Sequence, residues 1–102
     1  MTVAATLRVS QEDIVSFCRR NKIKELALFG SVLRGDVRPD SDVDVLVDFE
    51  PHAGHSLFDF VRMQEELGRL FGRKIDLVEK SGLHNPFRRY EILRTRQVIF
   101  AA

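Results

Sequence analysis

Residues 25–49 read ELALFGSVLRGDVRPDSDVDVLVDF, and this stretch decides the fold. Its first five residues form a short apolar run closed by Gly30, which predicts a strand buried on both faces. Residues 42–49 alternate between apolar and mostly acidic side chains, which predicts a second strand with one face toward the core. Between them, residues 32–34 predict one helical turn and residues 36–41 predict a loop. The stretch therefore predicts strand, turn, loop and strand in succession.

Two carboxylates at the start of the second predicted strand share a face. Successive side chains of a strand point to opposite sides, so Asp42 and Asp44 lie on one side, about 7 Å apart along the backbone. Carboxylates placed in this way can bridge hard divalent cations, which bind oxygen ligands and substrate phosphates. Gly30 and Ser31 add a turn whose backbone N–H groups and hydroxyl are suited to a phosphate. The pattern predicts metal-assisted transfer at a phosphate.

A third carboxylate, Asp76, lies in the middle of the predicted strand 74–78. A charge in mid-strand is rare unless it is exposed or takes part in chemistry. If this strand pairs beside residues 42–49, Asp76 joins Asp42 and Asp44 on one face, and bound divalent cations relieve their repulsion. A lone Asp-x-Asp is more often a solvent-facing strand end. The fixed spacing to the Gly-Ser turn and the presence of Asp76 favour a site.

Two polar residues near these carboxylates have open roles. Arg34 follows Ser31 by about one turn, where it can pair with a phosphate or with Asp36 or Asp42. Ser41 either orients the carboxylate of Asp42 or only closes the turn. Both are candidates for nucleotide contact.

The rest of the chain alternates between helical and strand patterns. Acidic residues stand three positions after two of the expected helix caps, as in reciprocal capping. Alternating helices and strands predict an α/β (α+β) fold, a small mixed sheet covered by helices. The helices are expected to begin after Ser10, Ser56 and Asn85, with Tyr90, Ile92, Leu93 and Phe87 lining the last helix, and a final strand or docked tail at residues 98–100.

Composition limits the possible classes of protein. The 102 residues are expected to form one domain, with a core over about residues 10–100, and the net charge of +1 gives no general attraction to nucleic acid. No apolar run approaches the length of a membrane span, and no secretory signal is apparent. The single cysteine, Cys18, lies on an apolar helical stripe and is expected to be a core residue. These features predict a cytoplasmic protein without a membrane or nucleic-acid partner.

The motif Gly30-Ser31-x10-Asp42-x-Asp44 with a later strand aspartate resembles the DNA polymerase β-like nucleotidyltransferase superfamily. Over residues 10–100, the size and pattern are similar to the minimal nucleotidyltransferases, the MNT proteins encoded beside HEPN-domain proteins. Many relatives carry alanine where this chain has Leu33, which changes local packing and not the ligands. The resemblance implies a polymerase β-like nucleotidyltransferase fold.

The resemblance also implies a reaction and a partner. Asp42, Asp44 and Asp76 would hold two Mg²⁺ ions, and Gly30 and Ser31 would contact the phosphates of ATP. The protein would be an antitoxin that transfers AMP to a tyrosine of a HEPN-domain ribonuclease toxin. With Asp76 as base, the chemistry would consist of positioning and charge neutralisation.

Two other functions fit the same residues. The chain can neutralise a partner by binding alone, or it can transfer a nucleotide to the hydroxyl of a small molecule. A chain of this size has no second domain to grip an acceptor, which favours a protein that brings its own binding surface. The last helix, with Phe87 and Tyr90 among arginines, is one candidate for that contact, and core packing is an equal explanation of its aromatic residues.

Overall fold

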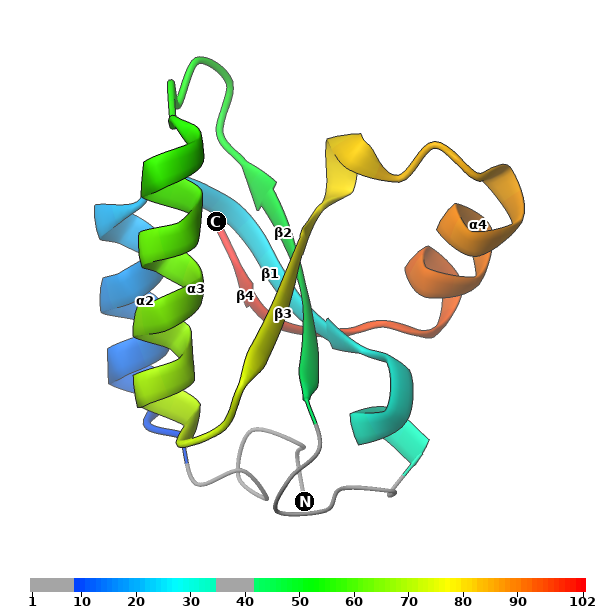
Figure 1. Cartoon of the computed structure of the whole chain (residues 1–102), viewed down its shortest axis with the longest axis horizontal. Helices are drawn as coiled ribbons and strands as arrows, with labels where there is room; N and C mark the ends of the chain where they lie inside the picture. Colours follow the sequence, from blue (N-terminus) through cyan, green and yellow to red (C-terminus); the bar gives the residue numbers. More distant parts are fainter. Residues whose placement is uncertain (1–8, 35–41) are drawn as a thin grey trace.

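The computed structural model describes residues 9–34 and 42–102. Figure 1 shows a central sheet with helices on both of its faces. The expected loosely paired N-terminus, up to residue 8, and the whole loop at 36–41 lie outside the described residues. In chain order the elements are α2 (Gln11–Arg20), β1 (Ile23–Phe29), η1 (Gly30–Arg34), β2 (Val43–Phe49), α3 (Leu57–Phe71), β3 (Ile75–Glu79), η2 (Lys80–Gly82), α4 (Pro86–Thr95) and β4 (Gln97–Ala101).

The four strands form one mixed sheet in the order β3-β2-β1-β4. Strand β1 runs antiparallel to both β2 and β4, whereas β2 and β3 are parallel. A parallel pair requires a crossover connection, and α3 supplies it. This architecture confirms the predicted small mixed sheet covered by helices, with β1 beginning two residues earlier than the sequence pattern predicts.

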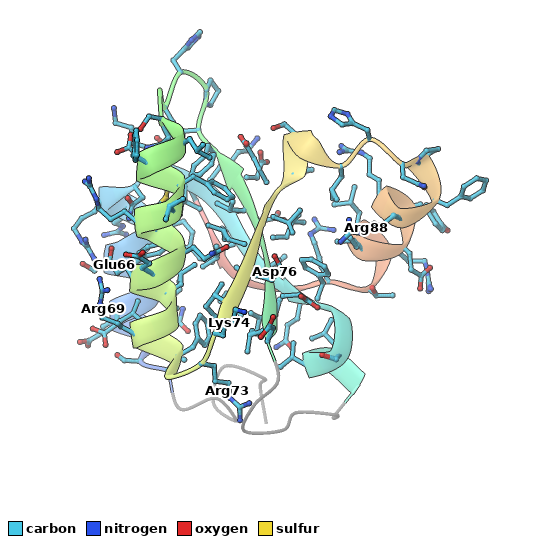
Figure 2. The ribbon with its side chains drawn as sticks, in the orientation of Figure 1. Glu66, Arg69, Arg73, Lys74, Asp76 and Arg88 are labelled. Carbon is cyan, nitrogen blue, oxygen red and sulfur yellow. The ribbon has the colours of Figure 1, made fainter. Side chains whose placement is uncertain are left out.

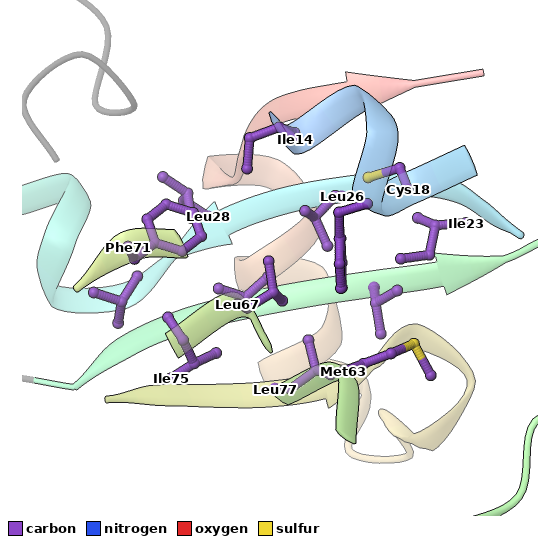
Figure 3. Close-up of a cluster of buried hydrophobic side chains, with 14 of the residues drawn as sticks. Ile14, Cys18, Ile23, Leu26, Leu28, Met63, Leu67, Phe71, Ile75 and Leu77 are labelled. Atoms are coloured by element: carbon purple, nitrogen blue, oxygen red, sulfur yellow. The ribbon is translucent and has the colours of Figure 1, made fainter. Parts of the chain in front are cut away.

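One face of the sheet forms the main core with α2 and α3 (Figure 3). The alternation predicted for β2 is confirmed, because Val43, Val45 and Val47 are buried on this face. Cys18 is also fully buried here, and burial raises the pKa of its thiol to about 12. The largest fully buried side chains are Phe17, Ile14, Ile23, Leu26, Leu28, Leu46, Met63, Leu67, Val43, Val45, Val47 and Cys18.

The opposite face has a smaller apolar cluster under α4. Leu46 points to this side and packs in a cluster with Ala27, Phe29, Leu83 and Ile92. Since Ile92 is the one residue of α4 that is buried, this helix covers only part of the face. The part of that face that α4 does not cover includes Asp44, at the start of β2.

Two of the three predicted N-terminal helix caps form side-chain hydrogen bonds. Ser56 and Asp59 form the predicted reciprocal cap of α3, with bonds of 3.2 and 2.9 Å, and Gly72 ends that helix in the left-handed conformation. Asn85 caps α4 by accepting from two backbone N–H groups. The predicted side-chain cap at Ser10 is wrong, because its side chain makes no cap hydrogen bond.

Of the two explanations left open for Phe87 and Tyr90, core packing is wrong. Phe87 is 85% exposed and Tyr90 is 66% exposed. The apolar contact of α4 is made by Ile92, with Leu93 packed beside it. Because α4 contacts the sheet along one narrow stripe, its aromatic residues point outward.

Candidate active site

The site is built on three adjacent strands at the end of the sheet where β2 begins. Asp44 pairs in register with Phe29 of β1 on one side and with Asp76 of β3 on the other. Register partners point to the same face of a sheet, and neighbouring strands are about 4.8 Å apart. Asp44 and Asp76 therefore lie side by side on the face opposite the main core. The predicted pairing of the two strands is confirmed.

Gly30 makes room for the carboxylate of Asp44. Its backbone has a φ of +77°, and a Cβ at this position would lie 2.2 Å from Oδ2 of Asp44. Any side chain here would displace that carboxylate, and the left-handed conformation itself favours glycine. The Gly-Ser turn and Asp44 are therefore parts of one local structure.

Asp42 precedes β2 and is exposed. The backbone N–H of Val43 donates to the carbonyl of Lys74 at 2.9 Å, so the ladder continues to this end of the two strands. Extending the register by one pair places Lys74 opposite Asp42 and on the same face as Asp76. A cation thus borders the carboxylates, and Figure 2 labels Lys74 and Asp76 along β3.

The Gly-Ser turn continues into η1, which carries two of the predicted phosphate contacts, Ser31 and Arg34. Ser31 is half-buried at the start of η1, which is a five-residue 3-10 helix and not a longer α-helix. Arg34 ends this element, and its side chain lies outside the described residues, as does Ser41. The turn therefore offers backbone N–H groups and one hydroxyl, with little contribution from a helix dipole.

The donor set at the site fits a hard cation. Asp42, Asp44 and Asp76 present only carboxylate oxygens, and Mg²⁺ is commonly bound by one or two carboxylates together with substrate phosphates. Within residues 9–34 and 42–102, no three Asp, Glu, His or Cys side chains converge on one point as a preformed metal site. The structure brings Asp44 and Asp76 together as neighbours, and Asp42 lies one strand repeat before them.

A pocket of about 590 Å³ adjoins the carboxylates between η1 and α4. Phe29 and Gly30, which contribute to it, are the register partner and the close neighbour of Asp44. Arg88 extends from α4 toward the sheet in Figure 2. The lining residues are Phe29, Gly30, Leu33, Arg88, Glu91, Ile92 and Thr95.

A larger pocket of about 710 Å³ lies at the other end of the sheet. It is bordered by the end of β2 and the connection to α3, including Asp48, His52 and His55. None of the predicted site residues lines it. Asp48 pairs with Lys80 at 3.8 Å, so this third acidic residue of the alternating strand has a local partner.

Sequence reasoning missed two cations near the carboxylates. Lys74 stands two residues before Asp76, and the alternation that places Asp76 on the site face also places Lys74 there. That signal was present in the sequence. Arg88 reaches the pocket only because α4 folds back over the sheet, and no local pattern shows this.

Comparison with known proteins gives a consistent result. Residues 12–99 match the family model described as nucleotidyltransferase domain. The protein adenylyltransferase MntA of Thermococcus cleftensis is 48% identical over 61 residues, which span 60% of each protein. The alignment thus covers about three fifths of that relative's length.

Solved structures share the fold. A structure of a proposed minimal nucleotidyltransferase is 39% identical, with a TM-score of 0.75 and 95% of both chains covered. The structure of the tri-AMPylated Shewanella oneidensis HEPN toxin in complex with MNT antitoxin matches at 16% identity. Its TM-score is 0.64, and the match covers 90% of this chain and 70% of that chain. At this identity the likeness concerns the fold alone.

Proposed function

The chain belongs to the nucleotidyltransferase domain family, and from this premise we propose that it transfers AMP from ATP to a tyrosine hydroxyl of a HEPN-domain toxin, in a Mg²⁺-dependent reaction, and acts as its antitoxin. The observation that carries the proposal is the register pairing of Asp44 with Asp76 beside Gly30. The name of the MntA relative supports adenylyl transfer, and the complex with an AMPylated HEPN toxin supports the acceptor.

Each residue of the site has a role in this reaction. Asp42, Asp44 and Asp76 would hold two Mg²⁺ ions, which supply charge neutralisation at the phosphates and lower the pKa of the attacking hydroxyl. Gly30 and Ser31 would bind phosphate oxygens through backbone N–H groups and the Ser31 hydroxyl. Arg34 and Ser41 remain candidates for further contact with the nucleotide.

The transfer itself balances without other reactants. The acceptor hydroxyl oxygen forms a bond to the α-phosphorus of ATP, and the bond from that phosphorus to the bridging oxygen breaks, releasing pyrophosphate. Asp76, which is exposed on the site face, is the proposed acceptor of the hydroxyl proton. The remaining work of the protein is to position the two reactants.

The experiment is the intact mass of a HEPN-domain toxin incubated with ATP, Mg²⁺ and the chain. We expect mass increments of whole AMP units with the natural sequence and none with the Asp42→Asn/Asp44→Asn double variant. Asp48→Asn is the matched control, because Asp48 lies on the same strand, pairs with Lys80 and borders the other pocket.

Three outcomes separate the candidate functions. An unmodified toxin that still binds both proteins would replace the proposal with an antitoxin that acts by occlusion. AMP transfer to a small hydroxylated molecule, with the toxin unmodified, would replace the acceptor. Equal transfer by the double variant would overturn the site assignment.

Figure 1 shows that the helices of the chain pack against the sheet, and none in the described part is long and apolar enough to cross a membrane. We propose that the protein works in the cytoplasm, where ATP is available. The toxin and the nucleotide are its proposed ligands.

A further inference from the structure

We propose that the exposed face of α4, formed by Phe87 and Tyr90, is the docking surface for the acceptor protein. In this proposal the adjoining pocket receives the aromatic side chain that accepts AMP. We call these two residues the α4 surface. The inference rests on the proposed adenylyl transfer and names the part of the chain that recognises the acceptor.

The first observation is the exposure of the aromatic residues. Phe87 is 85% exposed and Tyr90 is 66% exposed, although they are three residues apart on one helix and so lie side by side. Aromatic residues and arginine are enriched in protein interfaces and among the residues that dominate binding energy. An ordered helix that leaves such a pair uncovered is suited to a protein ligand.

The second observation is that this surface continues into the site. Glu91, Ile92 and Thr95 line the pocket at positions that share one side of the helix. Phe87 lies one helical turn before Glu91, so it is next to a lining residue on the surface of the helix. Phe29, the register partner of Asp44, also lines the pocket. A polypeptide on α4 therefore has a short path to the carboxylates.

The third observation concerns charge. Arg94 pairs with Glu91 at 2.7 Å, and Arg89 donates to the carbonyl of Lys80 at 3.1 Å. Arg88, which lines the same pocket, forms no ion pair with any residue of the described ranges. A guanidinium in the pocket next to the α4 surface is complementary to an acidic segment that carries an aromatic side chain.

The helix is also held in a defined place. Arg96, just after α4, bonds to the carboxylate of Glu25 on β1 at 2.8 Å, with both side chains about four fifths buried. Together with the bond from Arg89 to the carbonyl of Lys80 in η2, this contact holds α4 and its C-terminal end in place. A docking surface fixed relative to Asp44 can position an acceptor hydroxyl, which is the main contribution such an enzyme makes.

The pocket could alternatively hold the base of the nucleotide. A nucleotide base in the pocket would leave Phe87 and Tyr90 uncovered. The observations therefore favour the acceptor.

The test compares Phe87→Ser with Phe58→Ser. Phe58 is 81% exposed on α3, which covers the other face of the sheet, so the two variants remove the same side chain from equally exposed helical positions. We measure the affinity for a HEPN-domain toxin without ATP, the KM for that toxin, and the KM for ATP. Phe87→Ser is expected to weaken toxin affinity and raise its KM about tenfold, with the KM for ATP unchanged. Phe58→Ser is expected to stay within twofold of the natural sequence.

Each outcome decides the inference. Unchanged toxin affinity and KM in Phe87→Ser would overturn it, as would an equal loss in Phe58→Ser. A raised KM for ATP with an unchanged KM for toxin would assign the pocket to the nucleotide. If the natural sequence transfers no AMP, the proposed function fails. Toxin affinity without ATP then still tests the α4 surface, and loss of binding in Phe87→Ser alone would support it.

Discussion

Replacing Gly30 with alanine should separate the catalytic geometry from the stability of the fold. The new Cβ would lie 2.2 Å from Oδ2 of Asp44, whereas non-bonded atoms normally keep more than about 3 Å apart. The atom that clashes is at the end of a side chain, so the carboxylate rotates away by about 1 Å and the backbone keeps its place.

Two effects of different size follow. The left-handed backbone at φ +77° costs an alanine about 1–2 kcal/mol of unfolding free energy. Displacement of a catalytic group by about 1 Å costs on the order of 100-fold in rate, or about 2.7 kcal/mol of transition-state stabilisation. Gly30→Ala should therefore remain folded in water and lose nearly all AMP transfer.

Gly72→Ala is the matched control. Gly72 also has a positive φ, +64°, but a Cβ there meets no atom within 4 Å. It should lose about the same unfolding free energy in urea and keep its activity. The assays are AMP incorporation into a HEPN-domain toxin and, without any partner, calorimetric titration with ATP and Mg²⁺.

Either of two results would refute the reasoning. Full activity in Gly30→Ala would show that the position of the Asp44 carboxylate does not matter for transfer. Equal loss of activity in Gly72→Ala would show that backbone strain far from the carboxylates also abolishes transfer. The loss in Gly30→Ala would then not be evidence for the role of Asp44.

Two further predictions concern stability. Ser56→Ala should cost about 1 kcal/mol of unfolding free energy, measured in urea, because it removes a hydrogen-bonded helix cap. Ser10→Ala should cost much less, because the Ser10 side chain makes no cap hydrogen bond. Equal losses in the two variants would contradict the observed caps. Cys18, whose pKa burial raises to about 12, should resist iodoacetamide at pH 8 until the protein is unfolded. The folded thiol binds its proton more tightly than the unfolded one, whose pKa is about 9. The Cys18 thiol therefore has no effect on the free energy of unfolding at pH 7, and lowers it by up to about 1.4 kcal/mol per pH unit between pH 9 and 12. Rapid alkylation of the folded protein at pH 8 would disprove the raised pKa.

The sequence predicted those elements whose signals are local. Helix α3 has its reciprocal cap at Ser56 and its glycine end at Gly72, and both were confirmed because a cap involves only residues within one turn. Ser10 shows the limit of this reasoning. Its residue type suits a cap, but the formation of the bond depends on a rotamer that the sequence does not determine.

The sequence left open which way the aromatic residues of α4 point. A helical stripe shows which side chains share a face, and not which face meets the sheet. Helix α4 packs through Ile92, so Phe87 and Tyr90 are exposed, and Arg88 reaches the pocket. These placements depend on how α4 docks, which is a tertiary property.

The carboxylates of the site are held in place by the core on the other side of the sheet. Asp76 lies between Ile75 and Leu77, which are buried against the helices, so a slip of β3 by one residue would expose both and bury the charge. Exposing two such side chains costs about 3–6 kcal/mol, before the cost of a buried carboxylate is added. The same hydrophobic pattern that made Asp76 predictable therefore fixes its pairing with Asp44. The proposed catalytic arrangement is as stable as the register of the sheet itself.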